Sequence, residues 1–226
     1  MNLAAASGED LGQVSDIVTD ALTAFNMTAD QAGRFADVLA QASSNSNTNV
    51  AMMGATFQKV APVAGALGYS VEDVSLAIGL MANASIKSEV AGTSLKTALA
   101  NMAKPTKQMK EYMDKCGISL TNADGSMKSF REVVDNLRSS LGGLSETEQV
   151  AAATAIFGKE SFAGMLAIVN ASEADFQKLS DSVNNSAGAT ERMAAIKLDN
   201  LEGDITLLKS ATDGLQIALG LSLIHI

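Results

Sequence analysis

Residues 67–102 read LGYSVEDVSLAIGLMANASIKSEVAGTSLKTALANM, a pattern that predicts two helices joined by a short turn. Ser70 is a helix-capping residue with an acid, Asp73, three positions later, as in a capping box. Apolar residues then recur every three or four positions, which is the spacing of one helix face. We expect residues 84–88 to form an exposed turn. The residues expected to face inward are Val74, Ala77, Ile78, Met81, Val90, Leu95, Leu99 and Met102.

A related hairpin precedes this one in the chain. Residues 28–57 match residues 70–99 at an offset of 42 positions, so that Leu39 aligns with Met81. Repeats of this size are typical of helical solenoids, which need about three copies to be stable. Because only two copies are in register, we predict a compact bundle of pseudo-repeated hairpins instead.

Helix-start signals recur along the whole chain. We interpret six Ser or Thr residues as helix caps, each followed three residues later by an acid or amide: Ser7, Thr28, Ser70, Ser129, Ser145 and Ser172. Only two prolines interrupt the chain, which favours long helices. The sequence therefore predicts an all-α, multi-helix bundle.

One segment departs from the helical pattern. Residues 118–128 alternate between polar and apolar around Asp124-Gly125, a dipeptide typical of hairpin turns. We therefore expect one small β-hairpin near residues 118–128. An isolated hairpin is marginally stable in water, so it must pack against the helices.

The composition excludes several classes of function. The net charge is −9, whereas binding to nucleic acid requires clustered Lys and Arg. The single cysteine, Cys116, allows neither an internal disulfide nor a cysteine-based zinc site. No run of about 18 apolar residues occurs, so we predict no membrane-spanning helix.

No catalytic motif is visible in the sequence. The only histidine, His225, is the penultimate residue, which leaves no Ser-His-Asp triad and no histidine-based metal site. Residues 158–161, GKES, share letters with a phosphate-binding loop but lack its upstream glycine and its preceding strand. Paired acids such as Glu72 and Asp73 stand at helix starts, where the helix dipole stabilises them. We predict no enzymatic activity, no cofactor and no metal.

The last helical segment has a different period from the rest. Apolar residues alternate at spacings of three and four, as in the a/d seam of a coiled coil. The pattern fits a coiled coil and a long bundle helix about equally. We divide the chain into a helical core domain at 1–190, the start of a long or coiled-coil helix at 191–220, and a non-native tail at 221–226. The candidate helix–helix interface consists of Leu198, Leu201, Ile205, Leu208, Leu215 and Leu219, with Thr212 in the same register.

Several runs of residues, taken in order, carry a family resemblance. They are 2–11 (NLAAASGEDL), 35–42 (FADVLAQA), 60–68 (VAPVAGALG), 91–95 (AGTSL) with 103–105 (AKP), the segment 117–125, and 156–160 (IFGKE). Their order and spacing resemble the core region of phage tail tape measure proteins of the TP901 type, over nearly all of residues 1–220. Because that core begins upstream of an NLAAASGEDL-like run, we expect the chain to be a fragment at both ends.

The resemblance implies a structural role. Tape measure proteins are long helical chains inside the tail tube, where their length sets the tail length during assembly. It implies as partners other copies of the chain through a coiled coil, the tail tube protein, tail assembly chaperones and tail-tip proteins. It places the protein in the lumen of the virion tail, and in the host cytoplasm during assembly. The residues alone leave one alternative open, a stand-alone helical protein-interaction module, such as a bacterial adaptor or chaperone, without catalytic activity.

Overall fold

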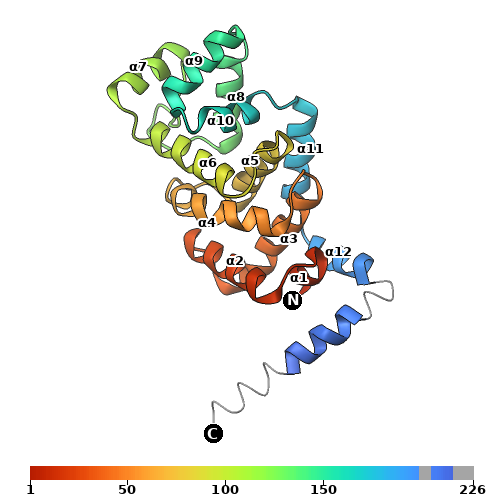
Figure 1. Cartoon of the computed structure of the whole chain (residues 1–226). Coiled ribbons are helices and arrows are strands. Elements are labelled where there is room, and N and C mark those ends of the chain that lie inside the picture. The colour runs from red at the N-terminus through yellow and green to blue at the C-terminus, as the bar shows by residue number, and fades with distance from the viewer. Residues whose placement is uncertain (199–204, 216–226) are drawn as a thin grey trace.

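The computed structural model of the chain describes residues 1–198 and 205–215 (Figure 1). These residues form helices and contain no strand. The predicted all-α class is therefore confirmed, whereas the β-hairpin predicted near residues 118–128 is absent. The elements are α1 (Asn2–Ser7), α2 (Leu11–Ala24), the 3-10 helix η1 (Ala29–Gln31), α3 (Ala32–Ser44), α4 (Val50–Ala66), α5 (Val71–Asn83), α6 (Ser88–Ala103), α7 (Lys107–Cys116), α8 (Phe130–Leu141), α9 (Glu146–Phe157), α10 (Phe162–Val169), α11 (Glu173–Asn184), α12 (Ala189–Leu198) and a further helix at 205–215.

Five of the six predicted helix starts are confirmed. At α5, the hydroxyl of Ser70 accepts the backbone N–H of Asp73 at 3.1 Å, and the Asp73 carboxylate accepts the backbone N–H of Ser70 at 3.0 Å. The sixth prediction is wrong, because Ser7 ends α1 and the cap of α2 is Asp10. A carboxylate can cap a helix as well as a hydroxyl can, so Asp10 takes this place and accepts the N–H of Gln13.

The two related hairpins pack on each other element by element. Helix α3 lies against α5, and α4 lies against α6. The hydroxyl of Thr56 on α4 donates to the carbonyl of Ser88 on α6 at 2.8 Å, and Gly92 allows this close approach. Aligned residues such as Leu39 and Met81 are both fully buried. The pseudo-repeat therefore builds the centre of the bundle.

Of the expected inward-facing residues in this hairpin, only Val90 is misplaced. Its side chain is 68% exposed, whereas Leu95, Leu99 and Met102 are buried as predicted. Val90 stands in the first turn of α6. A three-to-four spacing defines a stripe but not its edges, so a residue at the edge of the stripe can face solvent.

The predicted β-hairpin is wrong, although its turn is present. Thr121 and Met127 form a single antiparallel bridge, and Gly125 has the expected positive φ of 85°. The ladder does not extend beyond this bridge, because the backbone N–H of Thr121 donates to the hydroxyl of Ser119 and the backbone N–H of Ser119 donates to the side chain of Asn136. Local side-chain hydrogen bonds of this kind compete with strand pairing. The segment is a loop that packs on the helices.

The helices form a layered bundle with two ends (Figure 1). Helices α7 to α10 occupy one end, α1 and α2 occupy the other, and α5 and α6 lie between them. Helix α11 runs along α5 and α3, and so brings the chain back from the first end to the second. Helix α12 therefore packs against α1 and α3. The helix at 205–215, which follows α12 in the sequence, thus lies near the N-terminus.

Candidate assembly surface

Three residues of the predicted seam lie on the helix at 205–215. The side chains of Ile205, Leu208 and Leu215 are 63%, 71% and 60% exposed. Their spacing of three and seven positions places them on one side of that helix. Leucine and isoleucine are usually buried in folded proteins, so this face is an exposed apolar surface.

The other predicted seam residues are described in part or not at all. Leu201 and Leu219 lie outside the described residues, as does the expected non-native tail at 221–226. Leu198 is the last residue of α12, and its backbone is described. The predicted boundary at residues 190 and 191 falls in the first turn of α12, so the helix belongs in part to the folded domain.

Exposed apolar side chains are concentrated near the end of the described chain. Ten large apolar side chains are exposed on the described residues, and five of them fall in the short stretch from residue 196 to residue 215. Those five are Ile196, Ile205, Leu207, Leu208 and Leu215. Clustered apolar exposure of this kind marks interaction surfaces in soluble proteins.

The polar face of the same helix lies toward the folded domain. Thr206, Lys209, Ser210 and Asp213 line a cleft of about 610 Å³ together with α1 and the turn that contains Glu9. The helix therefore turns its polar side inward and its apolar side outward. A surface helix of a globular domain has the opposite orientation, with its apolar side against the core.

Asp37 holds the start of α12, the helix that precedes the helix at 205–215. Its two carboxylate oxygens accept the backbone N–H groups of Gly188 and Thr190 at 2.7 and 2.9 Å, and the Thr190 hydroxyl at 2.5 Å. Asp37 belongs to α3, so it caps the start of α12 from a different helix. A carboxylate at this place satisfies free N–H groups and complements the helix dipole.

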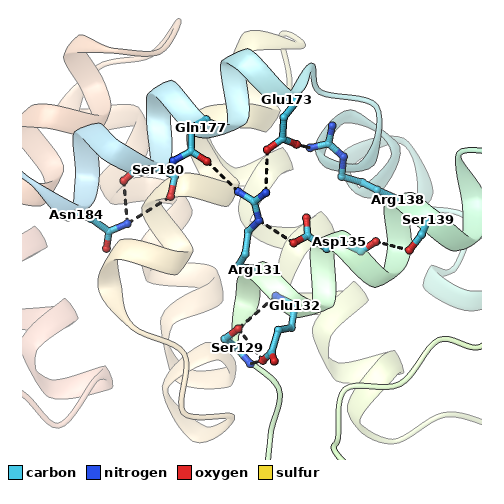
Figure 2. A network of polar contacts seen from close by, with 10 residues as sticks. All are labelled: Ser129, Arg131, Glu132, Asp135, Arg138, Ser139, Glu173, Gln177, Ser180 and Asn184. Atoms are coloured by element: carbon cyan, nitrogen blue, oxygen red, sulfur yellow. Dashed lines mark hydrogen bonds and ion pairs between the residues drawn. The ribbon is translucent and has the colours of Figure 1, made fainter.

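A second polar network joins α8 to α11 (Figure 2). Arg131 lies at its centre and donates to Asp135 and to Glu173, each at 2.8 Å. Its guanidinium also lies over the ring of Phe176, 4.4 Å from the ring centre, and Arg138 forms a further ion pair with Glu173 at 3.2 Å. These hydrogen bonds raise the pKa of Arg131, which therefore stays charged. The groups are half exposed, so the network positions α11 more than it stabilises the fold.

Metal ligands do not cluster in the part of the chain that the structure describes. There, no group of three or more His, Cys, Asp or Glu side chains is placed to hold a metal ion. Burial raises the pKa of Tyr69 to about 12, and its ring packs edge-to-face on Phe130. Tyr69 is therefore a packing residue of the hydrophobic core. Within the described residues, no helix is both long and apolar enough to cross a membrane.

The family is decided by a match over most of the chain. Residues 1–158 match the family model of the phage-related minor tail protein. The chain belongs to this family. The matched part of this phage-related minor tail protein runs from α1 to the end of α9, and so includes both pseudo-repeated hairpins.

Two curated relatives confirm the expected resemblance. The chain is 37% identical over 217 residues to the tape measure protein of Pneumococcus phage Dp-1, which covers 96% of this chain and 19% of the relative. It is 24% identical over 214 residues to the probable tape measure protein of Escherichia phage P2, covering 93% of this chain and 26% of the relative. The chain thus spans about a fifth to a quarter of the length of these relatives. No solved structure matches it.

The central residues of the two polar networks, Asp37 and Arg131, carry no signal in the sequence. Asp37 is an acid inside an amphipathic helix, and Arg131 follows a capping residue on another. Each acts on a partner more than 40 positions away, and neither distance is encoded in a local pattern. The apolar seam, in contrast, is a local pattern and is visible in the sequence.

Proposed function

We propose that this protein is a structural component of a phage tail and acts as a tape measure that scaffolds assembly of the tail tube and sets tail length. The observation that carries this proposal is the 37% identity to a tape measure protein over 96% of the chain. The described fold is consistent with it, because a helical domain that ends in a helix can lead into a rod. A helix rises about 1.5 Å per residue, so the residue count of a rod fixes its length.

The chain contributes two parts to this role. Residues 1–190 form a folded domain of the tape measure, and residues 191–220 begin the rod. The seam residues pair with the same residues of other copies in a coiled coil, which buries the exposed side chains of Ile205, Leu208 and Leu215. The inward-facing polar side of the helix at 205–215 supports this assignment, because it leaves the apolar side for the other copies.

The proposed partners and location follow from the tail role. The partners are the tail tube protein, tail assembly chaperones and tail-tip proteins. The protein occupies the lumen of the virion tail, after assembly in the host cytoplasm. A net charge of −9 fits a channel through which DNA passes, because a negatively charged surface repels the DNA backbone. The role is non-catalytic, in keeping with the structural nature of the related tail proteins.

A stop codon in the gene tests the proposal. Without the protein, phage-infected cells should yield no tails of normal length, and supplying the gene in trans should restore them. Mass spectrometry of purified virions should detect peptides of this chain in the tail. Normal tails in the mutant would instead support the alternative, a stand-alone helical interaction module.

A further inference from the structure

One polar residue interrupts the exposed apolar face of the helix at 205–215. The spacing of the face assigns Ile205 and Thr212 to the a positions of a heptad. It assigns Leu208 and Leu215 to the d positions. The side chain of Thr212 is exposed, like those of the three apolar residues. Thr212 is therefore the single polar position of the seam in this helix.

The hydroxyl of Thr212 has one partner inside its own helix. It donates to the carbonyl oxygen of Leu208 at 2.8 Å. The donor of the hydroxyl is thus satisfied, but its oxygen retains lone pairs that can accept hydrogen bonds. Burying these lone pairs against aliphatic side chains removes their water without replacing it, which costs free energy. The residue that faces Thr212 in an assembly therefore affects how stable that assembly is.

The sequence allows one alignment of two copies in which Thr212 faces another polar residue. In an antiparallel pair, an a residue faces a d residue of the partner helix, and every d position of the predicted seam is leucine. In a parallel pair that is shifted by one heptad, Thr212 faces Ile205 or Leu219. In a parallel pair in register, Thr212 faces Thr212 of the other copy. Only this last alignment keeps the hydroxyl out of the apolar layers.

The position of the folded domain is compatible with a parallel assembly. Thr206, Ser210 and Asp213 line the cleft between the helix at 205–215 and the domain. At 3.6 residues per turn, this polar side lies about 130° around the helix from the seam. In a symmetric parallel assembly the seams point toward a common axis, so the domains lie outside it. The contact with the domain and the contact between copies therefore use different sides of the helix.

We propose that Thr212 sets the alignment of the assembly, so that copies of the chain associate in parallel and in register with their Thr212 side chains in one layer. This inference rests on the proposed function, because it requires the seam to join copies of this chain. A polar residue at a single a position can specify register at a cost in stability. Copies held in register begin and end at the same level, so that each assembly has one defined length.

Disulfide cross-linking of the 226-residue chain tests the alignment. Three single-cysteine variants, Ile205→Cys, Leu208→Cys and Leu215→Cys, are made in a Cys116→Ser background and mixed in equal amounts. The mixture is equilibrated in a buffer of reduced and oxidised glutathione, and mass spectrometry identifies the cross-linked pairs. A shift of one heptad moves the partner by about 10.5 Å, beyond the reach of a disulfide. We expect same-site pairs to exceed mixed pairs at least about tenfold.

The same mixture with a second substitution tests the role of Thr212. Thr212→Val removes the hydroxyl and keeps the branched shape of the side chain. It should tighten association at least about threefold and reduce the excess of same-site pairs to less than about threefold. The matched control Thr206→Val makes the same change on the polar side of the helix. It should leave the tenfold excess of same-site pairs in place.

Two results would overturn this inference while leaving the seam intact. One is an association in which pairs such as 205 with 208, or 208 with 215, are as abundant as same-site pairs. The other is an undiminished excess of same-site pairs in Thr212→Val. A chain that stays monomeric at all concentrations and forms no cross-links would contradict the seam itself, and this inference with it. Sedimentation of the unmodified chain separates that outcome from the first two.

Discussion

The carboxylate of Asp37 accepts the backbone N–H of Thr190 at 2.9 Å, although 153 positions separate the two residues in the chain. The same carboxylate accepts the N–H of Gly188 at 2.7 Å. One side chain of α3 therefore holds the start of α12. Because α12 leads to the helix at 205–215, this contact joins the folded domain to the segment that we assign to assembly.

Replacing Asp37 should loosen this junction. Asp37→Ala leaves the N–H groups of Gly188 and Thr190 without their acceptor, so we expect a loss of about 1–3 kcal/mol in the free energy of unfolding. Urea denaturation measures this loss, and hydrogen exchange should locate it in α12. The control Asp30→Ala removes an exposed acid and should change stability by less than about 0.5 kcal/mol. Equal effects of the two substitutions would contradict the anchoring role.

Two glycines should respond to alanine with opposite signs. A Cβ at Gly92 would lie 2.8 Å from the carbonyl oxygen of Thr56 on α4, so Gly92→Ala should push α4 and α6 apart and cost about 1–3 kcal/mol. A Cβ at Gly33 meets nothing, so Gly33→Ala should stabilise the protein by about 0.5–1 kcal/mol. Thermal unfolding of both variants checks the pair. A stabilising Gly92→Ala would show that α4 and α6 pack less closely than described.

Two capping boxes should make the protein sensitive to acid. The hydroxyl and the backbone N–H of Ser129 lower the pKa of Glu132, and Ser145 lowers that of Glu148 in the same way. Both folded-state pKa values lie below the ordinary 4.5, so the stabilisation is present above that pH and is lost as the pH falls through the lowered values.

The melting temperature should therefore fall below about pH 4.5, and a Glu132→Gln, Glu148→Gln variant should show a shallower fall. Glutamine keeps the capping geometry without titrating. Melting curves from neutral to acidic pH compare the two proteins. Identical acid dependence would mean that other carboxylates control the loss of stability.

The apolar face of the helix at 205–215 should drive self-association. Leu208→Asp places a charge in the proposed seam and should reduce the association constant, measured by analytical ultracentrifugation, by at least about tenfold. Because Leu208 is 71% exposed, the melting temperature of the domain should not change. The control Ser210→Asp alters the polar face and should leave association intact. A chain that is monomeric at all concentrations would contradict the seam.

Local signals predicted most of the fold. Helix starts such as that of α5 depend on a few neighbouring residues, and Ser70 with Asp73 is enough to place one. The buried faces of the central hairpins follow from helical spacing alone, as Met81 and Leu95 illustrate. The all-α class is therefore readable from the sequence.

Features that depend on competition between local interactions, or on distant contacts, were not readable. The alternation at 118–128 favours a hairpin, but the backbone N–H groups of Ser119 and Thr121 bond to side chains in place of a facing strand. The cap that Asp37 supplies to α12 depends on a contact between residues 151 to 153 positions apart. For the candidate surface, the sequence revealed which residues are apolar, and the structure revealed that Leu208 and Leu215 face outward.

Tail length in virions that carry an altered form of this protein tests the central claim most directly. An in-frame insertion of about 70 residues (ten heptads) after residue 215 should lengthen the tail by about 105 Å in electron micrographs, because each helical residue adds about 1.5 Å. The same number of residues inserted between Ala123 and Asp124, in an exposed loop of the folded domain, should leave the length unchanged. Tails of unchanged length with the heptad insertion would contradict the account.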